Sequence, residues 1–417
     1  MIKPRRLYLL GIALILVVPI LLQGCNANQT SNKESDHVIT IRELDYFTSD
    51  PSDSVMNDLI ESFEKTHPNI KIKRSSVDRD TLSMKIIQQG ATHSLPSLLV
   101  LDNPSLQQVA DADILTPLNK LANIDKSDYF SSSLSTVTYK DQLYGLPLGN
   151  NTLALFYNKK MFKDKNIEPP KTWDDLLTAA KQLTQGSTYG IAFAAPNNEE
   201  GTWQFLPFLW SNGGTLSKID SQNAIGALNF WKELVDKGYA SKSVVNWTQS
   251  NVEQQFSHGN AAMMVNGLWE LPTLDAVKGL DYGVVQLPVP EEGEQPKVPL
   301  GGEVITIPKT SPEKEKAAWT FVEWMQDKER LADVNQQFTY ISAYKPAAED
   351  LIKQNPKWKP FYDQFQNGQA RTKDLGMNYP VASEAVWTAI QEVLTDKKTA
   401  KDALEEVQKK IDQLTYD

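Results

Sequence analysis

Two carboxyl groups and one amide stand at positions where they could act on a bound molecule. Asp102 and Asn103 follow a short apolar run, and Glu303 follows the pair Gly301-Gly302, beside which backbone and ligand can approach closely. Paired carboxyl groups cleave glycosidic bonds in glycoside hydrolases, and the same groups bind hydroxyls without any reaction. These residues alone therefore leave an enzyme and a binding protein as alternatives.

Motifs of other enzyme classes are absent from the sequence. There is no GxSxG element and no Walker loop, and the histidines do not have the HExxH spacing of a zinc site. The four histidines are His37, His67, His93 and His258. We therefore expect no catalytic residue, no metal and no cofactor.

Two tryptophans are candidates for the wall of a binding site. Trp269 follows the turn-forming pair Asn266-Gly267 and precedes Pro272, and Trp203 lies outside a regular helical period. An indole face can cover the C–H patch of a sugar ring, and packing in a core is the alternative for each. The weaker aromatic candidates are Tyr46, Phe47 and Tyr379.

The single cysteine follows a segment that is typical of secretion. A basic start precedes the charge-free apolar run 7–22, which is short for a membrane span. The sequence Leu22-Gln23-Gly24-Cys25 resembles the bacterial lipobox, whose cysteine accepts a diacylglycerol. We predict a signal peptide over 1–24 and lipidation of Cys25. Because the following residues are polar and aperiodic, we predict a flexible tether over 25–36.

Composition excludes one class of partner and sets the domain count. The net charge is −10 and no stripe of lysine and arginine stands out, so we expect no nucleic-acid partner. The remaining ~380 residues are more than a single hydrophobic core usually contains, which predicts two domains.

The first part of the body alternates strands and helices. Apolar residues alternate along 37–44 and recur at helical spacing from Met56 to Phe63, before His67-Pro68 ends the helix. The next predicted elements are a strand over 69–77, a helix over 81–89 and a buried strand over 96–102. This order predicts an α/β fold with a parallel sheet, whose ligands bind beyond the carboxyl ends of the strands.

Several later segments resemble one family in order and spacing. They are similar to bacterial family 1 extracellular solute-binding proteins, the maltose-binding type that serves ABC importers of sugars. The matching segments are YGLPLGNNTLALFYNKKMFKDKNIEPPKTWDDLLTAAKQLT (144–184), GTWQFLPFLWSNGG (201–214), HGNAAMMVNGLWELP (258–272), LPVPEEGEQPKVPLGGEVITIP (287–308) and a helical close over 383–414. The resemblance extends from about residue 37 to the C-terminus.

The resemblance implies a periplasmic-binding-protein type II (Venus flytrap) fold, with two discontinuous Rossmann-like α/β lobes that close around the ligand. Carried onto this sequence, the first lobe comprises 37–148 plus 281–337, and the second 151–277 plus 340–417. The hinge crossings are expected near 149–150, 279–280 and 338–344.

The resemblance also implies the kind of ligand and its contacts. In the family an aromatic residue of an NGPW motif stacks on sugar, and Trp269 stands at that place, with Leu268 instead of the usual proline. A polar group at the first crossing commonly faces the ligand, which points to Asn150 and Asn151. We expect a monomer that delivers a di- or oligosaccharide to ABC permease subunits, anchored on the extracellular face of a Gram-positive membrane.

Other ligands of the same fold remain alternatives. Glycerol phosphate is disfavoured because only seven arginines occur and none lies in the matching segments. Polyamine sites also combine aromatic and acidic groups, so an acidic aromatic cleft does not exclude them. An iron ligand and a surface adhesin without a small ligand are further alternatives.

Overall fold

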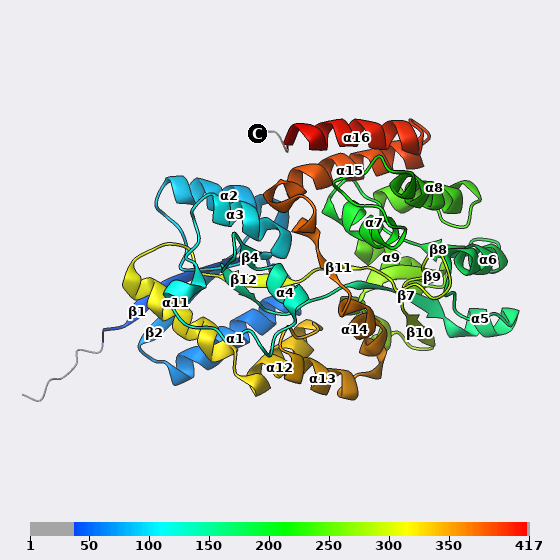
Figure 1. Ribbon diagram of the computed structural model, residues 1–417. Coiled ribbons are helices and arrows are strands. Elements are labelled where there is room, and N and C mark those ends of the chain that lie inside the picture. Colours follow the sequence, from blue (N-terminus) through cyan, green and yellow to red (C-terminus); the bar gives the residue numbers. More distant parts are fainter. Residues whose placement is uncertain (1–36, 415–417) are drawn as a thin grey trace, which may run out of the picture. The chain divides into compact units, whose positions relative to one another are not determined.

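Two β-sheets organise the residues that the structure describes, 37–414 (Figure 1). The computed structural model has a five-stranded sheet of order β2-β1-β3-β12-β6 and a four-stranded sheet of order β10-β7-β9-β8. We call each sheet with its helices lobe 1 and lobe 2. The strands of lobe 1 are β1 (Ile39–Asp45), β2 (Ile70–Ser76), β3 (Leu98–Asp102), β6 (Gly145–Pro147) and β12 (Glu303–Thr306). The strands of lobe 2 are β7 (Leu153–Asn158), β8 (Tyr189–Ala192), β9 (Ala261–Gly267) and β10 (Tyr282–Val285).

The remaining elements surround these sheets. The helices of lobe 1 are α1 (Ser52–Thr66), α2 (Arg79–Ala91), α3 (Leu106–Asp111), α4 (Ser131–Ser135), α11 (Pro312–Met325) and α12 (Lys328–Phe338). The helices of lobe 2 are α5 (Lys159–Lys165), α6 (Trp173–Leu183), α7 (Glu199–Ser211), α8 (Gln222–Asp236), α9 (Gln249–Ser257), α10 (Leu271–Ala276), α13 (Lys345–Gln354), α14 (Lys359–Phe365), α15 (Tyr379–Leu394) and α16 (Ala400–Leu414). The short strand pairs are β4 (Thr138–Tyr139) with β5 (Gln142–Leu143), and β11 (Pro299–Leu300) with β13 (Gln369–Ala370). The 3-10 segments are η1 (Asn103–Ser105), η2 (Leu118–Lys120), η3 (Lys242–Asn246), η4 (Leu268–Glu270), η5 (Pro356–Trp358), η6 (Arg371–Lys373) and η7 (Gly376–Asn378).

The start of lobe 1 confirms the predicted alternation of strands and helices. β1 pairs in parallel with both β2 and β3, so their carboxyl ends meet at one edge of the sheet. Helix α1 buries one apolar face of Val55, Met56, Leu59, Ile60 and Phe63 and ends just before His67. Burial of this face is the main stabilising term for such a helix.

Local signals also position the start of lobe 2. Thr172 and Asp175 form a capping box at the N-terminus of α6, in which each side chain accepts a hydrogen bond from the backbone N–H of the other residue.

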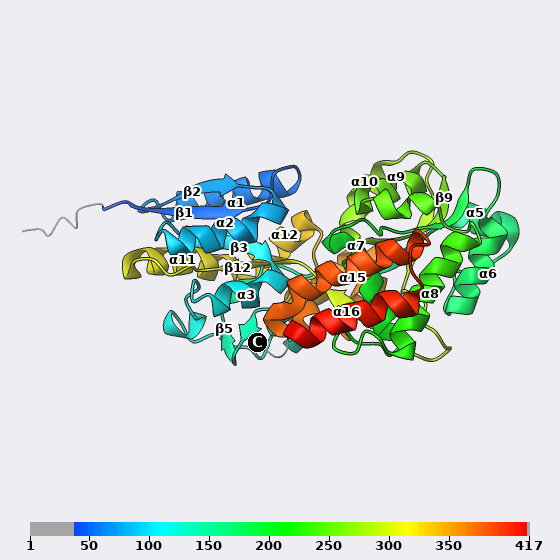
Figure 2. The same ribbon diagram turned by 90° about the horizontal axis from the view of Figure 1, so that it is seen from above.

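Helices α15 and α16 lie side by side and cover α7 and α8, as Figure 2 shows from above. The C-terminal segment thereby completes the core of lobe 2.

The chain passes between the lobes at three adjacent places. The backbone of Asn150 exchanges hydrogen bonds with Ile341, at 2.8 and 2.7 Å, and that of Asn151 exchanges them with Gly301, at 3.2 and 2.9 Å. Tyr340 packs in the core of lobe 1, and Ile341 packs in a core cluster of lobe 2. The three connections therefore form one hydrogen-bonded strip between the sheets.

One predicted crossing is wrong. The interval 281–300 was expected in lobe 1 after a crossing near 279–280, but β10 pairs antiparallel with β7 in lobe 2. The chain returns to lobe 1 only at Gly301-Gly302, where β12 begins and pairs with β3. Antiparallel pairing with β7 supplies partners for the backbone of β10, which holds this segment in lobe 2.

The predicted signal peptide (1–24), Cys25 and the tether (25–36) lie outside the described residues. Within 37–414, no helix has the length and apolar character needed to cross a membrane.

Candidate functional site

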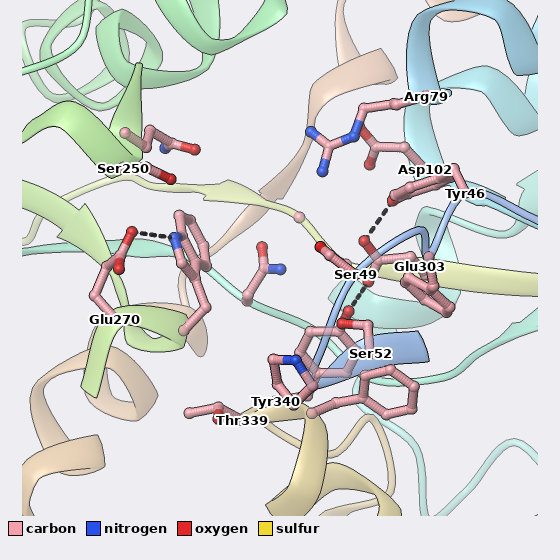
Figure 3. Close-up of a pocket in the computed structure, with 18 of the residues that line it drawn as sticks. Tyr46, Ser49, Ser52, Arg79, Asp102, Ser250, Glu270, Glu303, Thr339 and Tyr340 are labelled. Atoms are coloured by element: carbon pink, nitrogen blue, oxygen red, sulfur yellow. Dashed lines mark hydrogen bonds between the residues drawn. The ribbon is translucent and has the colours of Figure 1, made fainter. Parts of the chain in front are cut away.

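A cleft with a volume of about 430 Å³ is lined by both lobes (Figure 3). This size is within the range of small-molecule sites. The lining residues of lobe 1 are 46–52, Arg79, Asp102, Glu303 and 338–340. Those of lobe 2 are Glu199, Glu200, Trp203, Gln249, Ser250, Trp269, Glu270, Pro272, Thr273 and Arg371. The crossings contribute Asn151, Gly301 and Gly302. Contacts from both lobes mean that the site is complete only when the lobes are together.

Trp269 forms a half-buried aromatic wall on the lobe 2 side. It lies in η4, directly after β9, and its indole Nε1 donates to Oε1 of Glu270 at 3.1 Å (Figure 3). A Cβ on Gly267 would lie 2.0 Å from the indole ring, so only glycine at that position lets the ring fold back over the strand end. The ring is thus fixed from both its edge and its face.

Glu270 is a buried carboxyl group in the same wall. Burial and, to a smaller extent, the negative charge of Glu253 raise its pKa, the bond from Trp269 opposes the shift, and the net result is a pKa of about 7 instead of 4.5. Its side chain therefore changes charge close to neutral pH, next to the residue that we expect to contact the ligand.

Glu270→Gln should change how stability depends on pH. A carboxyl group whose pKa is raised on folding stabilises the folded state below pH 4.5 and loses this effect as the pH rises through about 7. We expect the variant to gain on the order of 2 kcal/mol relative to wild type between pH 4.5 and pH 8. Urea unfolding at both pH values measures this, with exposed Glu291→Gln as the control. An equal pH dependence of wild type and variant would contradict the assignment.

Glu303 is the acidic group at the centre of the lobe 1 wall. Only 6% of the residue is exposed, and its carboxylate accepts hydrogen bonds from the phenols of Tyr46 and Tyr340 (Figure 3). Burial and the charge of Asp102 raise its pKa, whereas the two phenols stabilise the ionised form. Glu303 thereby ties the loop after β1 to the third crossing.

The loop 46–52 is held in place by charges at the end of β1. The carboxylate of Asp45 accepts from the backbone N–H of Phe47 at 2.9 Å, and Arg74 donates to Asp45 at 2.6 Å and to the carbonyl of Phe47 at 2.8 Å. This network directs Tyr46 and Phe47 into the cleft lining.

Arg371 and Trp203 form the wall between the lobes. The guanidinium donates to Asp102 of lobe 1 and to Oε1 of Glu199 at 2.9 Å, and its Cζ lies 4.9 Å from the centroid of the Trp203 ring. Trp203 lies inside α7, in a stretch whose sequence shows no regular helical period. The period is missing because every residue from Gly201 to Ser211 is buried, so the helix has no exposed polar face.

Arg79 is the second cation of the lining. It is the first residue of α2, its side chain is exposed, and its Cζ lies 4.9 Å above the Tyr46 ring. The carboxylates of Asp102 and Glu303 raise the pKa of Arg79, so it is a permanent cation.

The structure brings seven of the ten predicted ligand residues to the cleft. These are Trp269, Trp203, Asp102, Glu303, Asn151, Tyr46 and Phe47. The other three are buried outside the lining and bond to the protein itself. The amide of Asn103 donates to the carbonyl of Leu300 at 3.0 Å, that of Asn150 donates to Gly301 at 3.1 Å, and the phenol of Tyr379 donates to Glu199 at 2.6 Å.

Several lining residues were missed by the sequence analysis. They are Arg79, Glu199, Glu200, Gln249, Ser250, Glu270 and Arg371, together with the loop residues Ser49 and Ser52. One available signal was Asn198, which caps α7 and places Glu199 and Glu200 in its first turn. The others show no local pattern, because distant parts of the chain bring them together. Among the described residues no group of three metal-ligating side chains is placed to hold a metal ion.

A sequence model of the family described as bacterial extracellular solute-binding proteins matches residues 58–360. This chain belongs to that family. Solute-binding proteins of this family bind rather than transform their ligands and act outside the bacterial cytoplasm.

Relatives of this solute-binding protein include two named for oligosaccharides. The galactooligosaccharide-binding protein of Bacillus subtilis is 22% identical over 405 residues, covering 93% of each chain. The maltotriose-binding protein of Pyrococcus abyssi is 27% identical over 321 residues, covering 73% of this chain and 67% of that protein.

Solved structures share the two-lobed α/β fold. A solute-binding protein of an ABC transporter from Thermotoga lettingae, bound with α-D-tagatose, has a TM-score of 0.79 and 25% identity and covers 90% of this chain and 99% of its own. The GacH receptor of Streptomyces glaucescens, solved without ligand and in complex with acarbose, has a TM-score of 0.80 and 22% identity and covers 91% of this chain and 99% of its own. These structures confirm the predicted fold class.

Proposed function

We propose that this protein captures a neutral carbohydrate, a di- or oligosaccharide, between its lobes and delivers it to the permease of an ABC importer. The observation that carries the proposal is the cleft itself, which combines the half-buried indole of Trp269 with carboxylates from both lobes. An aromatic face suits the C–H patch of a sugar ring, and carboxylates accept hydrogen bonds from its hydroxyls. Relatives named for galactooligosaccharides and maltotriose support this ligand class.

A thermal-shift and calorimetric panel tests the ligand class. Purified protein is titrated with maltooligosaccharides, galactooligosaccharides, glycerol phosphate and spermidine. A ligand that binds only the folded state raises the melting temperature, and we expect this with one of the saccharide series alone. A shift with glycerol phosphate or spermidine and none with saccharides would overturn the proposal.

The cleft lining contains two arginines, and arginine is the residue that typically binds phosphate groups. Arg371 already donates to Asp102 and Glu199, so its Nη atoms are engaged by the protein. Arg79 is the other cation, and carboxylates outnumber arginines in the lining. An acidic cleft opposes a phosphate dianion, which supports a neutral polyol as the ligand.

We infer that the protein does not cleave its ligand. Asp102 is paired with Arg371 and Glu303 accepts hydrogen bonds from two phenols, so both carboxyl groups are already engaged by partners within the protein. A general acid must instead be free to donate its proton to the glycosidic oxygen of the ligand. Incubation with labelled oligosaccharides should give saturable binding without product.

The N-terminal segment is proposed to anchor the protein to the outer face of a Gram-positive membrane. Removal of residues 1–24 leaves Cys25 as an acylated N-terminus, and the polar tether keeps a monomeric binding body near its permease at high effective concentration.

Cys25→Ala should separate anchoring from binding. We expect the variant to appear in the culture medium or to stay unprocessed, because no thiol accepts the lipid, and its saccharide affinity should equal that of wild type. Fractionation with phase partitioning, followed by calorimetry of the purified variant, measures both. Membrane retention of processed Cys25→Ala protein would contradict the anchor.

A further inference from the structure

One guanidinium group bonds both lobes beside the cleft. Arg371 belongs to η6, only 3% of it is exposed, and it contacts the lobe 2 residues Glu199 and Trp203 described above. The same group donates from Nη2 to the carboxylate of Asp102, at the carboxyl end of β3 in lobe 1. Its planar fork serves two carboxylates at once, which a lysine ammonium does not match.

The two sides of this ion cluster differ in how firmly they are fixed. On lobe 2, Glu199 also accepts from the hydroxyls of Tyr379 and Ser383, at 2.6 and 2.5 Å, so Arg371 is held by a network within its own lobe. On lobe 1, Asp102 is the ion-pair partner of Arg371, and its side chain keeps 17% of its surface exposed. Separation of the lobes would therefore break the Asp102 bond and leave the Glu199 bond intact.

A neighbouring contact crosses between the lobes at the same place. The amide of Gln107, on α3 of lobe 1, donates to Oγ1 of Thr372 at 3.2 Å. Thr372 follows Arg371 directly in the sequence. Two successive residues of η6 thus form hydrogen bonds with lobe 1. Both bonds exist only while the lobes are together.

We propose that Arg371 is a positioning residue that couples ligand capture to lobe closure. Its bond to Asp102 forms in the closed arrangement, and there it fixes Asp102 from lobe 1 and Trp203 from lobe 2 on the same side of the cleft. A buried ion pair of this kind selects one arrangement over others more than it adds net stability. The role at the ligand depends on the proposed function, whereas the bias toward closure does not.

Ligand-free protein tests the bias toward closure. Small-angle X-ray scattering is recorded for wild type, Arg371→Lys and Asp102→Asn, with Arg330→Lys as the matched control, since Arg330 lies over Trp324 and outside the cleft lining. We expect a larger radius of gyration for the two cleft variants and wild-type values for the control. Equal radii in all four proteins would overturn the proposal, even if no saccharide binds.

Ligand kinetics test the coupling. With the saccharide that shifts the wild-type melting temperature, we expect Arg371→Lys to weaken affinity about 10-fold or more, mainly through faster dissociation. The double variant Asp102→Asn/Arg371→Lys should bind no worse than the weaker single variant, because both changes remove one bond. Effects that multiply in the double variant, or wild-type affinity of Arg371→Lys, would overturn the coupling. Calorimetric melting of each variant confirms that it is folded, and Arg371→Gln repeats the test without a charge.

Discussion

Replacing Trp269 by alanine is expected to weaken saccharide binding about 100-fold or more, equivalent to about 2.7 kcal/mol. The indole is the largest half-buried apolar surface that lobe 2 offers to the cleft, and Gly267 and Glu270 fix it before any ligand binds. A fixed ring loses little conformational entropy on binding, so most of its contact energy contributes to affinity. Removing the ring also leaves a polar, water-accessible gap beside the sugar.

Calorimetric titration of Trp269→Ala with the preferred saccharide measures this effect. Trp319→Ala is the control, because Trp319 is also partly buried but packs on the core of lobe 1, outside the lining. The control should lose stability and keep its affinity. An affinity of Trp269→Ala within about threefold of wild type would show that the ring only supports the lobe 2 core.

Gly302→Ala is expected to lower the free energy of unfolding by about 4 kcal/mol, the sum of backbone strain and overpacking. Gly302 has φ of +104°, and a Cβ there would lie 2.3 Å from the carbonyl oxygen of Gly149. That oxygen belongs to the neighbouring crossing. The strip between the lobes cannot widen without breaking the hydrogen bonds that join Asn150 and Asn151 to its other strands.

Gly293→Ala separates the two contributions. Gly293 has φ of +91° but no atom within 4 Å of a Cβ at that position, so this variant carries the backbone strain alone. We expect it to lose about 1 kcal/mol in urea unfolding. Equal losses in the two variants would mean that close packing at the crossings does not limit this position.

The elements that could be predicted from the sequence are those with local signals. β1 and α1 show clear periods, and Thr172 with Asp175 gives a capping box that the structure confirms. Trp269 was found because Asn266-Gly267 marks the end of a strand. In each case the signal lies within a few residues of the feature that it predicts.

The rest depends on contacts between distant parts of the chain. Arg371 meets Asp102 across 269 residues, and no spacing rule relates them. β10 was placed in the wrong lobe because its four residues carry no sequence pattern that indicates pairing with β7. The amides of Asn103 and Asn150 were expected to face the ligand, but the backbone carbonyls of Leu300 and Gly301 beside them accept their hydrogen bonds.

The place of β12 has a consequence for how the chain is made. β12 lies between β3 and β6, yet it follows all four strands of lobe 2 in the sequence. A ribosome therefore completes lobe 2 strands before lobe 1 receives the strand that joins β6 to its sheet. Until then β3 and β6 each have an edge without its partner strand, so the sheet of lobe 1 is incomplete and open to pairing with other strands during synthesis.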